Sequence, residues 1–451
     1  MRSLTYGELI GGNRNFRNLL AGQFISELGN WFNFIAGLGL VRVVSDASPT
    51  AAGIFFVARL IPFALASPIA GTFVDRFSRR QVMIGSDLLR VLIALSFLLV
   101  TSKENLWIAY LATVLLHTLG AFFDGAKNAA APNLAGKEGL LAATALLFST
   151  RFLLMAIGSA LGGWAAAVFG YEVAFIINAA SFLASAYTVW LIPEEATRDE
   201  QTGARMRKFG RATPAEIVPA TFDELGESGT QAIERATFLT ELKEGLSYTV
   251  KNHFAFTILI MNMIWATGGG SINVIFERIG GVHFAKTEGW NADIAVAVLW
   301  TATGIGLTIG MLIAHRVSLM LDRRNLNVSF IGWTLIIHGV LFSVGGLMPT
   351  LWLFGVIVLV SRAIVGVEYA VQETMFQRSL PDYIRGRIST LDRGAEMTVF
   401  GLSSYVASEA MYYITPQTLT VISGILSALA GVVWFIRERK SEPPTYAGGS
   451  D

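Results

Sequence analysis

The sequence predicts an all-α membrane protein with about twelve transmembrane helices. Hydrophobic residues make up 53% of the 451 residues and charged residues 15%, whereas about a quarter of the residues in a soluble domain are charged. The apolar residues are concentrated in runs of about 20 residues, which is long enough for a helix to cross a bilayer. A polar segment, 193–252, separates these runs into two sets of six.

The first set of apolar runs lies in an N-terminal unit, 1–192. By the length rule we expect its spans at 16–41, 51–71, 82–101, 105–127, 141–169 and 171–192. The second set lies in a C-terminal unit, 253–451, which ends in a cytoplasmic tail. Its spans are expected at 253–276, 293–315, 328–347, 350–377, 390–413 and 416–437.

The segment 193–252 is rich in charged residues, Gly, Ser and Pro, and it predicts a long cytoplasmic linker. Its end, 238–248, predicts an amphipathic surface helix that leads into the seventh span. Most Lys and Arg residues of the short loops fall on the same side as the two termini. On the other side only four are expected: Arg42, Lys103, Arg278 and Lys286. The positive-inside rule therefore predicts that both termini are cytoplasmic.

Composition also excludes several site chemistries. The chain has no cysteine, which rules out disulfides, thiolate metal sites and cysteine nucleophiles. Its five histidines show no metal-ligand spacing, and it has no Gly-x-x-x-x-Gly-Lys-Ser/Thr phosphate loop. We therefore expect no enzyme activity, no metal, no cofactor and no nucleic-acid partner.

One charged loop between the second and third spans reads Gly71-Thr-Phe-Val-Asp75-Arg76-Phe-Ser-Arg79-Arg80. Its pattern, Gly-x-x-x-Asp-Arg-x-x-Arg-Arg, resembles the loop signature of the major facilitator superfamily of secondary transporters. The resemblance covers nearly the whole chain. It implies two six-helix bundles, related as parallel repeats around a central cavity, with the substrate site near mid-membrane.

The loop arginines can pair with carboxylates and with the negative C-terminal ends of helices. Such contacts would hold a cytoplasmic gate shut while the outer side is open. We therefore expect gating roles for Gly71, Asp75, Arg76, Arg79 and Arg80. The alternative is that this basic loop only anchors the protein to the inner membrane surface.

The ends of the fourth and tenth spans resemble each other. Aligning Pro132 with Pro381 places Asp124 over Glu373. Both acids lie near the cytoplasmic ends of their spans, which favours partners of the loop arginines across the gate over proton carriers.

Three stretches narrow the family resemblance. They are Leu20-Ala-Gly-Gln-Phe-Ile-Ser-Glu-Leu-Gly-Asn-Trp-Phe, Ser86-Asp87-Leu-Leu-Arg90 and Pro381-Asp382-x-x-Arg385-Gly386-Arg387. They resemble the bacterial efflux branch that includes enterobactin-type siderophore exporters and macrolide exporters. This resemblance implies a proton-driven exporter of the bacterial inner membrane and does not identify its cargo.

The fifth span carries Gly158-Ser-Ala-Leu-Gly162-Gly163, which resembles the glycine-rich antiporter motif of exporters. Ser159 stands where that motif usually has Pro. The family motif implies a seal on the cytoplasmic side that favours antiport. Ordinary close packing of helices explains the glycines equally well.

The first span carries a polar stripe, because Gln23, Glu27 and Asn30 lie on one helical face. A polar stripe in a membrane span faces protein or a water-filled cavity. Glu27 is deep enough to be the candidate proton carrier, since a desolvated carboxylate binds a proton more readily. Alternatively it is the permanent partner of an arginine such as Arg59 in the second span.

Arginines outnumber acids inside the other spans. The arginines are Arg59, Arg90, Arg151 and Arg362, and the acids at comparable depth are Glu27, Asp87 and Glu368. Asp87 and Arg90 are three residues apart and predict a structural pair. The remaining surplus favours an anionic cargo, unless these arginines bind carbonyls or serve packing.

The seventh span adds Asn262 and Trp265 as candidate cargo contacts. Gly268-Gly269-Gly270 follows them and should loosen the helix. The predicted substrate cavity is formed by Asn262 and Trp265 together with Gln23, Asn30, Arg59, Arg151, Arg362 and Glu368.

Together these observations predict a proton-coupled exporter of a drug-like or siderophore-like small molecule that works by alternating access. Its expected partners are the cargo, protons and membrane lipids. Three alternatives stay open: a lysophospholipid or lipid flippase of the same fold, an uncoupled facilitator, and a transport-dead membrane sensor or scaffold.

Overall fold

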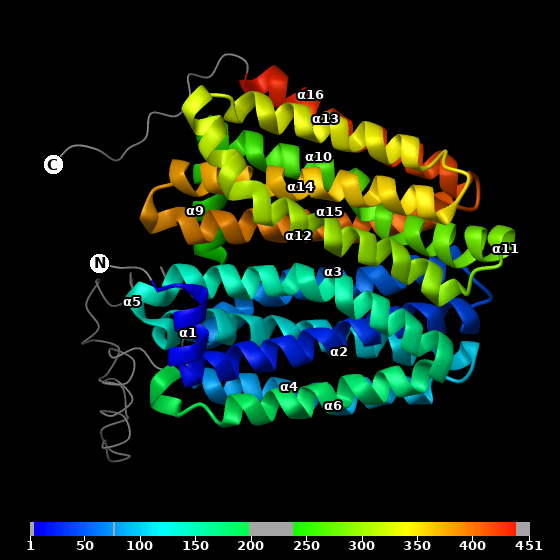
Figure 1. Cartoon of the computed structure of the whole chain (residues 1–451), viewed down its shortest axis with the longest axis horizontal. Coiled ribbons are helices and arrows are strands. Elements are labelled where there is room, and N and C mark those ends of the chain that lie inside the picture. The colour runs from blue at the N-terminus through cyan, green and yellow to red at the C-terminus, as the bar shows by residue number, and fades with distance from the viewer. Residues whose placement is uncertain (1–3, 75–76, 198–237, 439–451) are drawn as a thin grey trace.

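Two groups of long helices lie side by side (Figure 1). The computed structural model describes residues 4–74, 77–197 and 238–438, and no strand occurs among them. The first group comprises α1 (Tyr6–Gly12), α2 (Arg14–Val44), α3 (Pro49–Val74), α4 (Arg79–Ser96), α5 (Leu106–Phe169) and α6 (Tyr171–Trp190). The second group comprises α9 (Phe238–Lys251), α10 (His253–Arg278), α11 (Ala285–Glu288), α12 (Ala292–Arg324), α13 (Asn327–Gly345), α14 (Leu351–Ser379), α15 (Asp382–Ala410) and α16 (Pro416–Glu438). The predicted all-α class is confirmed.

Polar side chains mark the starts of several helices. At α1 the Glu8 amide donates to Thr5 Oγ1 (3.3 Å) and the Thr5 amide donates to Glu8 Oε2 (2.8 Å), which forms a capping box. The hydrogen bonds from Thr5 hold the pKa of the Glu8 carboxyl below its usual value. Asn13, Asn252 and Asn291 cap α2, α10 and α12, each by accepting a hydrogen bond from a backbone amide with its side chain.

A glycine, and not a polar loop, separates two of the expected spans. The spans predicted at 105–127 and 141–169 both fall within α5. Gly136 interrupts the helical backbone between them, with φ at 69° and ψ at 171°. Only glycine adopts this conformation without strain. Gly170, with φ at 84°, then separates α5 from α6.

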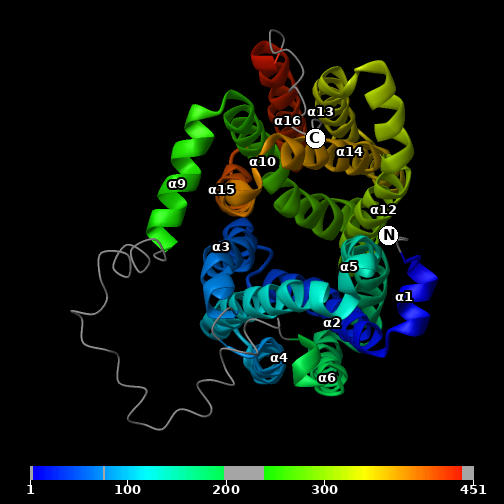
Figure 2. The same ribbon diagram turned by 90° about the vertical axis from the view of Figure 1, so that its left-hand side faces the viewer.

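Ten helical segments in the described part of the chain are long and apolar enough to cross a membrane. They lie in α3, α4, both parts of α5, α6, α10, α12, α13, α14 and α16. α2 and α15 do not meet this criterion: polar residues such as Glu27, Asn30 and Asn33 lower the hydropathy of α2, and several charged residues lie within α15. They lie among the other helices of their groups (Figure 2). A membrane protein is therefore confirmed, and the count of twelve spans stays a prediction.

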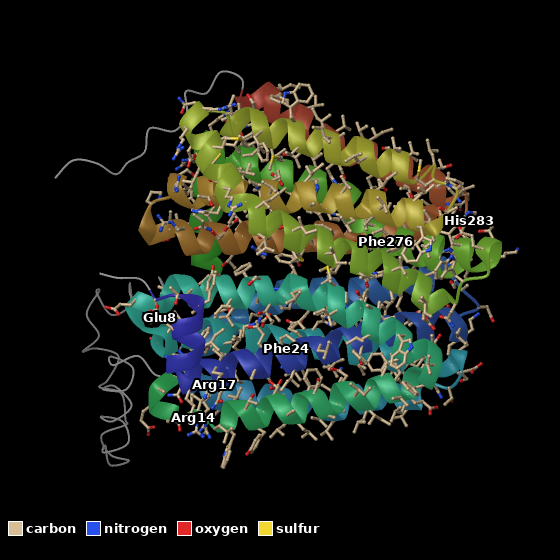
Figure 3. The ribbon with its side chains drawn as sticks, viewed as in Figure 1. Glu8, Arg14, Arg17, Phe24, Phe276 and His283 are labelled. Carbon is tan, nitrogen blue, oxygen red and sulfur yellow. The ribbon has the colours of Figure 1, made fainter. Side chains whose placement is uncertain are left out.

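The surface of the protein also suits a bilayer. Large apolar side chains are exposed along the helices, including Phe24, Leu92 and Leu312. Figure 3 shows Phe24 midway along α2, whereas Glu8 lies at one end of the molecule. This end, which contains α1, is called the α1 end below. The opposite end, which contains α11, is called the α11 end (Figure 1).

The two groups share a hydrophobic core only toward the α11 end. That core contains Trp31 and Phe34 of α2 together with Phe276 of α10 and Trp300 of α12. The rings of Phe34 and Trp300 meet edge to face across the groups, with centroids 5.2 Å apart. Toward the α1 end, each group has a separate core among the described residues. The groups are thus joined at one end by packing that is not repeated at the other.

The predicted linker lies partly outside the described residues, which omit 198–237. Before this gap a short 3-10 helix covers Glu194–Thr197, and after it α9 occupies the place of the expected surface helix. The boundaries at 192 and 252 and the amphipathic role of α9 stay predictions.

Gly136→Ala is expected to destabilise the protein by about 1–3 kcal/mol, because alanine is strained at this positive φ. The measurement is thermal unfolding followed by the fluorescence of the ten tryptophans. Gly120→Ala is the matched control, since Gly120 lies in regular helix and an added Cβ meets no atom within 4 Å. Equal unfolding temperatures for the two variants would contradict the strain argument.

Candidate functional site

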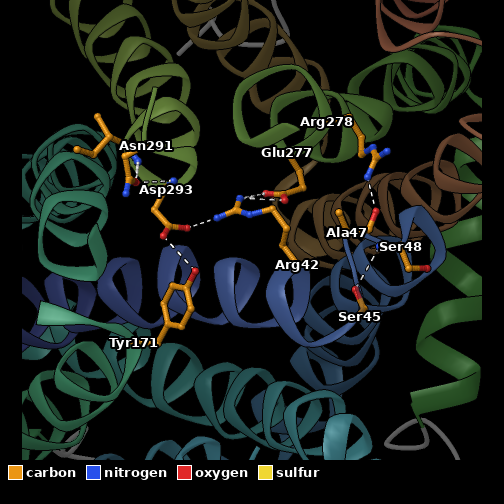
Figure 4. Close-up of polar contacts among 10 residues, drawn as sticks. Arg42, Ser45, Ala47, Ser48, Tyr171, Glu277, Arg278, Asn291 and Asp293 are labelled. Carbon is orange, nitrogen blue, oxygen red and sulfur yellow. Dashed lines mark hydrogen bonds and ion pairs between the residues drawn. The ribbon is translucent and has the colours of Figure 1, made fainter. Parts of the chain in front are cut away.

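A buried ionic network joins the two groups of helices at the α11 end (Figure 4). Arg42 of α2 donates from Nη1 to both carboxylate oxygens of Glu277 on α10, at 3.0 and 3.2 Å. Its Nη2 donates to Asp293 of α12. The three side chains are at most 9% exposed. One guanidinium therefore pairs with two carboxylates that belong to the opposite group.

Neighbouring residues fix the geometry of this network. Tyr171, at the start of α6, donates its hydroxyl to Asp293 Oδ2 (3.1 Å). Asn291 caps α12 by accepting from the amides of Asp293 (2.9 Å) and Ile294 (3.2 Å). The sequence Asn-x-Asp therefore begins the helix and holds the carboxylate in reach of Arg42. The Asp293 carboxylate is bound by Arg42 and Tyr171, and its backbone amide is bound by Asn291.

A second set of contacts lies beside the first. Arg278 donates to the carbonyl of Ala47 in the turn between α2 and α3. Thr50 at the start of α3 donates to Glu409 Oε1 of α15 (2.6 Å) and to the Tyr412 hydroxyl (3.2 Å). Together with the Arg42 network, these contacts close the α11 end across both groups.

The glycine-rich run of α5 lies where that helix packs on α12. Ser159 Oγ donates to the Met155 carbonyl (2.5 Å) and lies 3.1 Å from Thr301 Oγ1 of α12. A Cβ on Gly163 would come within 2.3 Å of the Ala297 Cβ, so this glycine is required for the close approach. The packing interpretation of the run is supported here, and its role in antiport stays a prediction.

In the first group, Arg59 of α3 lies among aromatic side chains of α2. Its guanidinium carbon is 3.9 Å from the ring centroid of Phe34 and 5.6 Å from that of Trp31. The charges of Glu27 and Arg151 are close enough to act on it. The structure therefore brings together the predicted carrier Glu27 and two predicted cavity arginines, with no ion pair between Glu27 and Arg59 within 4 Å.

The other polar residues of the α2 stripe, Gln23 and Asn30, have different surroundings from Glu27. Gln23 is buried and donates from Nε2 to the Leu147 carbonyl of α5 (2.9 Å), which is a packing contact. Asn30 is half-buried. The predicted pair of Asp87 and Arg90 is present and buried within α4.

The described arginines of the charged loop bind carbonyls within their own group. Arg79 Nη1 donates to the carbonyls of Ala129 (3.1 Å) and Thr197 (3.0 Å). Arg80 Nη2 donates to the carbonyl of Trp190 at the end of α6 (2.6 Å). The predicted contact with a helix C-terminal end is therefore present for Arg80.

The remaining gate candidates are placed as follows. Gly71 is exposed near the end of α3, and Asp75 and Arg76 lie outside the described residues. Asp124 pairs with Lys127 Nζ (2.6 Å), and Glu373 Oε1 accepts from Gln377 Nε2 (2.6 Å). In this conformation the two acids bind neighbours on their own helices, and their gating role stays a prediction.

A polar pocket lies among α10, α14 and α15 of the second group. Asn262 Nδ2 donates to Asp392 Oδ2 (2.9 Å), and Gln372 Nε2 donates to Asn262 Oδ1 (2.9 Å). Arg393 donates to the Tyr369 hydroxyl. The remaining lining residues are Glu373, Phe376, Ser389 and Glu396. This group of residues is called the α15 pocket below.

Glu368 of α14 lies near the α15 pocket. It is 4% exposed, the charge of Glu396 acts on it, and its Oε1 has no hydrogen-bond partner among the described residues. Arg362, one turn and a half earlier, is buried with its guanidinium carbon 5.9 Å from the Phe342 ring. Trp265 packs its ring on Phe400, with centroids 5.3 Å apart.

Two features of this arrangement were not predicted from the sequence. The first is the Arg42 network, because its residues come from three helices whose contacts no local pattern reveals. The second is the pair Asp392 and Glu396, which are four residues apart and so share a helical face. That spacing inside an expected span was an available signal. In the described part of the chain, no three His, Asp or Glu residues are grouped to hold a metal ion.

Several known proteins are similar to this chain. The sequence profile of the Major Facilitator Superfamily matches residues 19–391. The chain is 29% identical over 202 residues to the uncharacterized MFS-type transporter YfiS of Bacillus subtilis, a match that covers 44% of this chain and 48% of that protein. It is 22% identical over 388 residues to macrolide efflux protein A of Streptococcus pyogenes, which covers 83% and 84% of the two chains.

Among solved structures, the fold is similar to that of a bacterial homologue of the iron transporter ferroportin in its inward-facing state. The TM-score is 0.67, and the match covers 95% of this chain and 99% of the other. The sequence identity is 17%, so this likeness establishes the fold alone.

Arg42→Gln is expected to open the α11 end, because it leaves Glu277 and Asp293 without a cation in a buried site. A cysteine at Ser408 reports this, since Ser408 is fully buried against Gly53 of the other group and the chain has no native cysteine. We expect maleimide labelling of Ser408→Cys in purified protein to become at least about tenfold faster in the Arg42→Gln background.

The control is Tyr413→Cys, because Tyr413 is 89% exposed and should label equally fast in both backgrounds. If Arg42→Gln leaves the labelling rate at position 408 unchanged, the network does not hold this end closed.

Proposed function

Because the chain belongs to the Major Facilitator Superfamily, we propose that it is a proton-coupled exporter of a drug-like or siderophore-like small molecule. The observation that carries this proposal is the similarity to macrolide efflux protein A, which extends over more than four fifths of both chains. We place the protein in a bacterial inner membrane, as the bacterial relatives suggest.

The α1 end faces the cytoplasm in this proposal. The basic residues Arg79 and Arg80 lie at that end, and the positive-inside rule favours cytoplasmic positions for such residues. The Arg42 network then closes the outer side in the present conformation. Breaking it while the α1 end closes would expose bound cargo to the outside, which is alternating access.

Two acids are the proposed proton carriers, Glu27 of the first group and Glu368 of the second. Each lies inside a helix bundle, where an ionised carboxylate is costly unless it is paired. Glu368 has an unpartnered oxygen and no ion-pair partner among the described residues. Glu27 lies near Arg59 without a close ion pair, so its protonation would alter the charge that Arg59 experiences.

Everted membrane vesicles that contain the protein are expected to accumulate radiolabelled erythromycin when they are energised, and a protonophore should abolish this. Glu27→Gln and Glu368→Gln each remove a titratable group, so the variant that loses at least about tenfold of the energised uptake identifies the proton carrier. The matched control is Glu104→Gln, because Glu104 is exposed in the short helix Lys103–Asn105.

Accumulation that persists with the protonophore would contradict proton coupling and favour the uncoupled facilitator. Full energised uptake in both acid variants would contradict the assignment of the carriers while leaving export intact.

A further inference from the structure

The α15 pocket is built from three helices and held by hydrogen bonds. Asn262 of α10 bridges Gln372 of α14 and Asp392 of α15, with both bonds at 2.9 Å. This bridge engages only Oδ2 of Asp392. Its Oδ1 is buried without a hydrogen-bond partner among the described residues, and the whole residue is 9% exposed. The pocket therefore has a fixed acceptor that nothing in the described chain satisfies.

Negative charge predominates around this acceptor. Asp392, Glu396, Glu373 and the adjacent Glu368 provide four carboxylates, whereas Arg393 provides the single guanidinium. Arg393 is held by the Tyr369 hydroxyl, with its guanidinium carbon 5.8 Å from that ring. Across the described residues, no Lys or Arg forms an ion pair with any of the four acids. When ionised, the group carries three net negative charges.

Either protons or a cation must compensate this unmatched charge, and the donor arrangement selects the kind of cation. The described acids do not form a group that could hold a metal ion. An organic ammonium is different, because each N–H can bond to a separate oxygen and the carbon substituents can contact aromatic rings such as Tyr369 and Phe376. Carboxylate and amide oxygens of the α15 pocket are suitable acceptors for it.

We propose that the α15 pocket binds the protonated amine of a lipophilic cargo, with Asp392 and Glu396 as its direct charge partners. This inference rests on the proposed export function and narrows the cargo class to amines. It replaces the expectation of an anionic cargo, which depended on counting arginines. Two of those arginines, Arg59 and Arg362, lie over aromatic rings.

Protons compete with an amine for the same oxygens. The titratable groups facing the α15 pocket are Glu368, Tyr369 and Glu373 of α14 and Asp392, Arg393 and Glu396 of α15. α10 contributes the neutral Asn262. Two further helices pack against α15. On α3 the charged residue Arg59 packs on Phe34, and on α9 the charged residues Lys243 and Glu244 are exposed. Amine affinity is therefore expected to rise with pH as the carboxylates ionise.

The test is equilibrium binding of dansylcadaverine, a fluorescent primary amine, to the purified full chain in lipid nanodiscs. Fluorescence anisotropy is measured after subtraction of empty nanodiscs. The neutral N-acetyl derivative has the same apolar body without the charge. We expect the amine to bind at least about tenfold more tightly than this derivative, and more tightly at pH 8 than at pH 6.

Asp392→Asn keeps the size of the side chain and, like Glu396→Gln, is expected to weaken amine binding at least about tenfold. Glu104→Gln should bind as the unmodified chain does. Gel filtration confirms that each variant is folded, and the comparison of the amine with its acetyl derivative needs no variant. Equal affinity for both ligands, or unchanged affinity in both acid variants, would overturn the proposal.

This measurement is independent of transport. Acid-dependent amine binding in a protein that shows no proton-driven uptake would contradict the export function and leave the amine site standing. Proton-driven uptake in a protein whose amine affinity does not depend on Asp392 and Glu396 would support the export function and contradict the amine site.

Discussion

The pairing of Arg42 with Glu277 and Asp293 is the contact on which the arrangement of the two helix groups depends. Burying one guanidinium and two carboxylates is costly, and only close ion pairs with additional hydrogen bonds offset that cost. Tyr171 supplies such a bond to the Asp293 carboxylate, and the helix cap at Asn291 fixes the Asp293 backbone. Since Arg42 belongs to one group and the two carboxylates to the other, the ion pairs offset the cost of burial only while the groups are in contact. At the α1 end the separate cores provide no such contact.

The interiors of the two groups carry opposite charge imbalances. In the first group, the four cations Arg59, Arg90, Arg151 and Lys127 outnumber the three acids Glu27, Asp87 and Asp124. In the second, the α15 pocket holds several acids around Arg393. An unpaired charge inside a membrane protein is expensive and marks a functional position. An amine and a proton would satisfy the same acids at different times, which is the simplest physical basis for exchanging one against the other.

Regular local patterns were predictable from the sequence, and contacts between distant segments were not. The apolar runs located most helix ends to within a few residues. The exceptions are α12, which extends nine residues past its expected span, α15, which begins eight residues before its expected span, and α5, where Gly136 replaced the expected loop. The pair Asp87 and Arg90 was predictable because both residues lie on one helix. Arg42 was counted as an outer-loop charge, since its partners are more than 200 residues away and only the folded chain brings them together.

α10 connects the ionic network to the α15 pocket. It carries Asn262 at the pocket and Glu277 at the network, roughly 22 Å apart along the helix axis. Three glycines, 268–270, lie between them, and the helix is continuous there. A Cβ on Gly270 would come within 2.3 Å of the Phe400 carbonyl, so the α10 backbone packs directly on α15. If α10 moves as a unit, a ligand that displaced Asn262 would also displace Glu277, and occupancy of the pocket would then act on the contact that closes the α11 end.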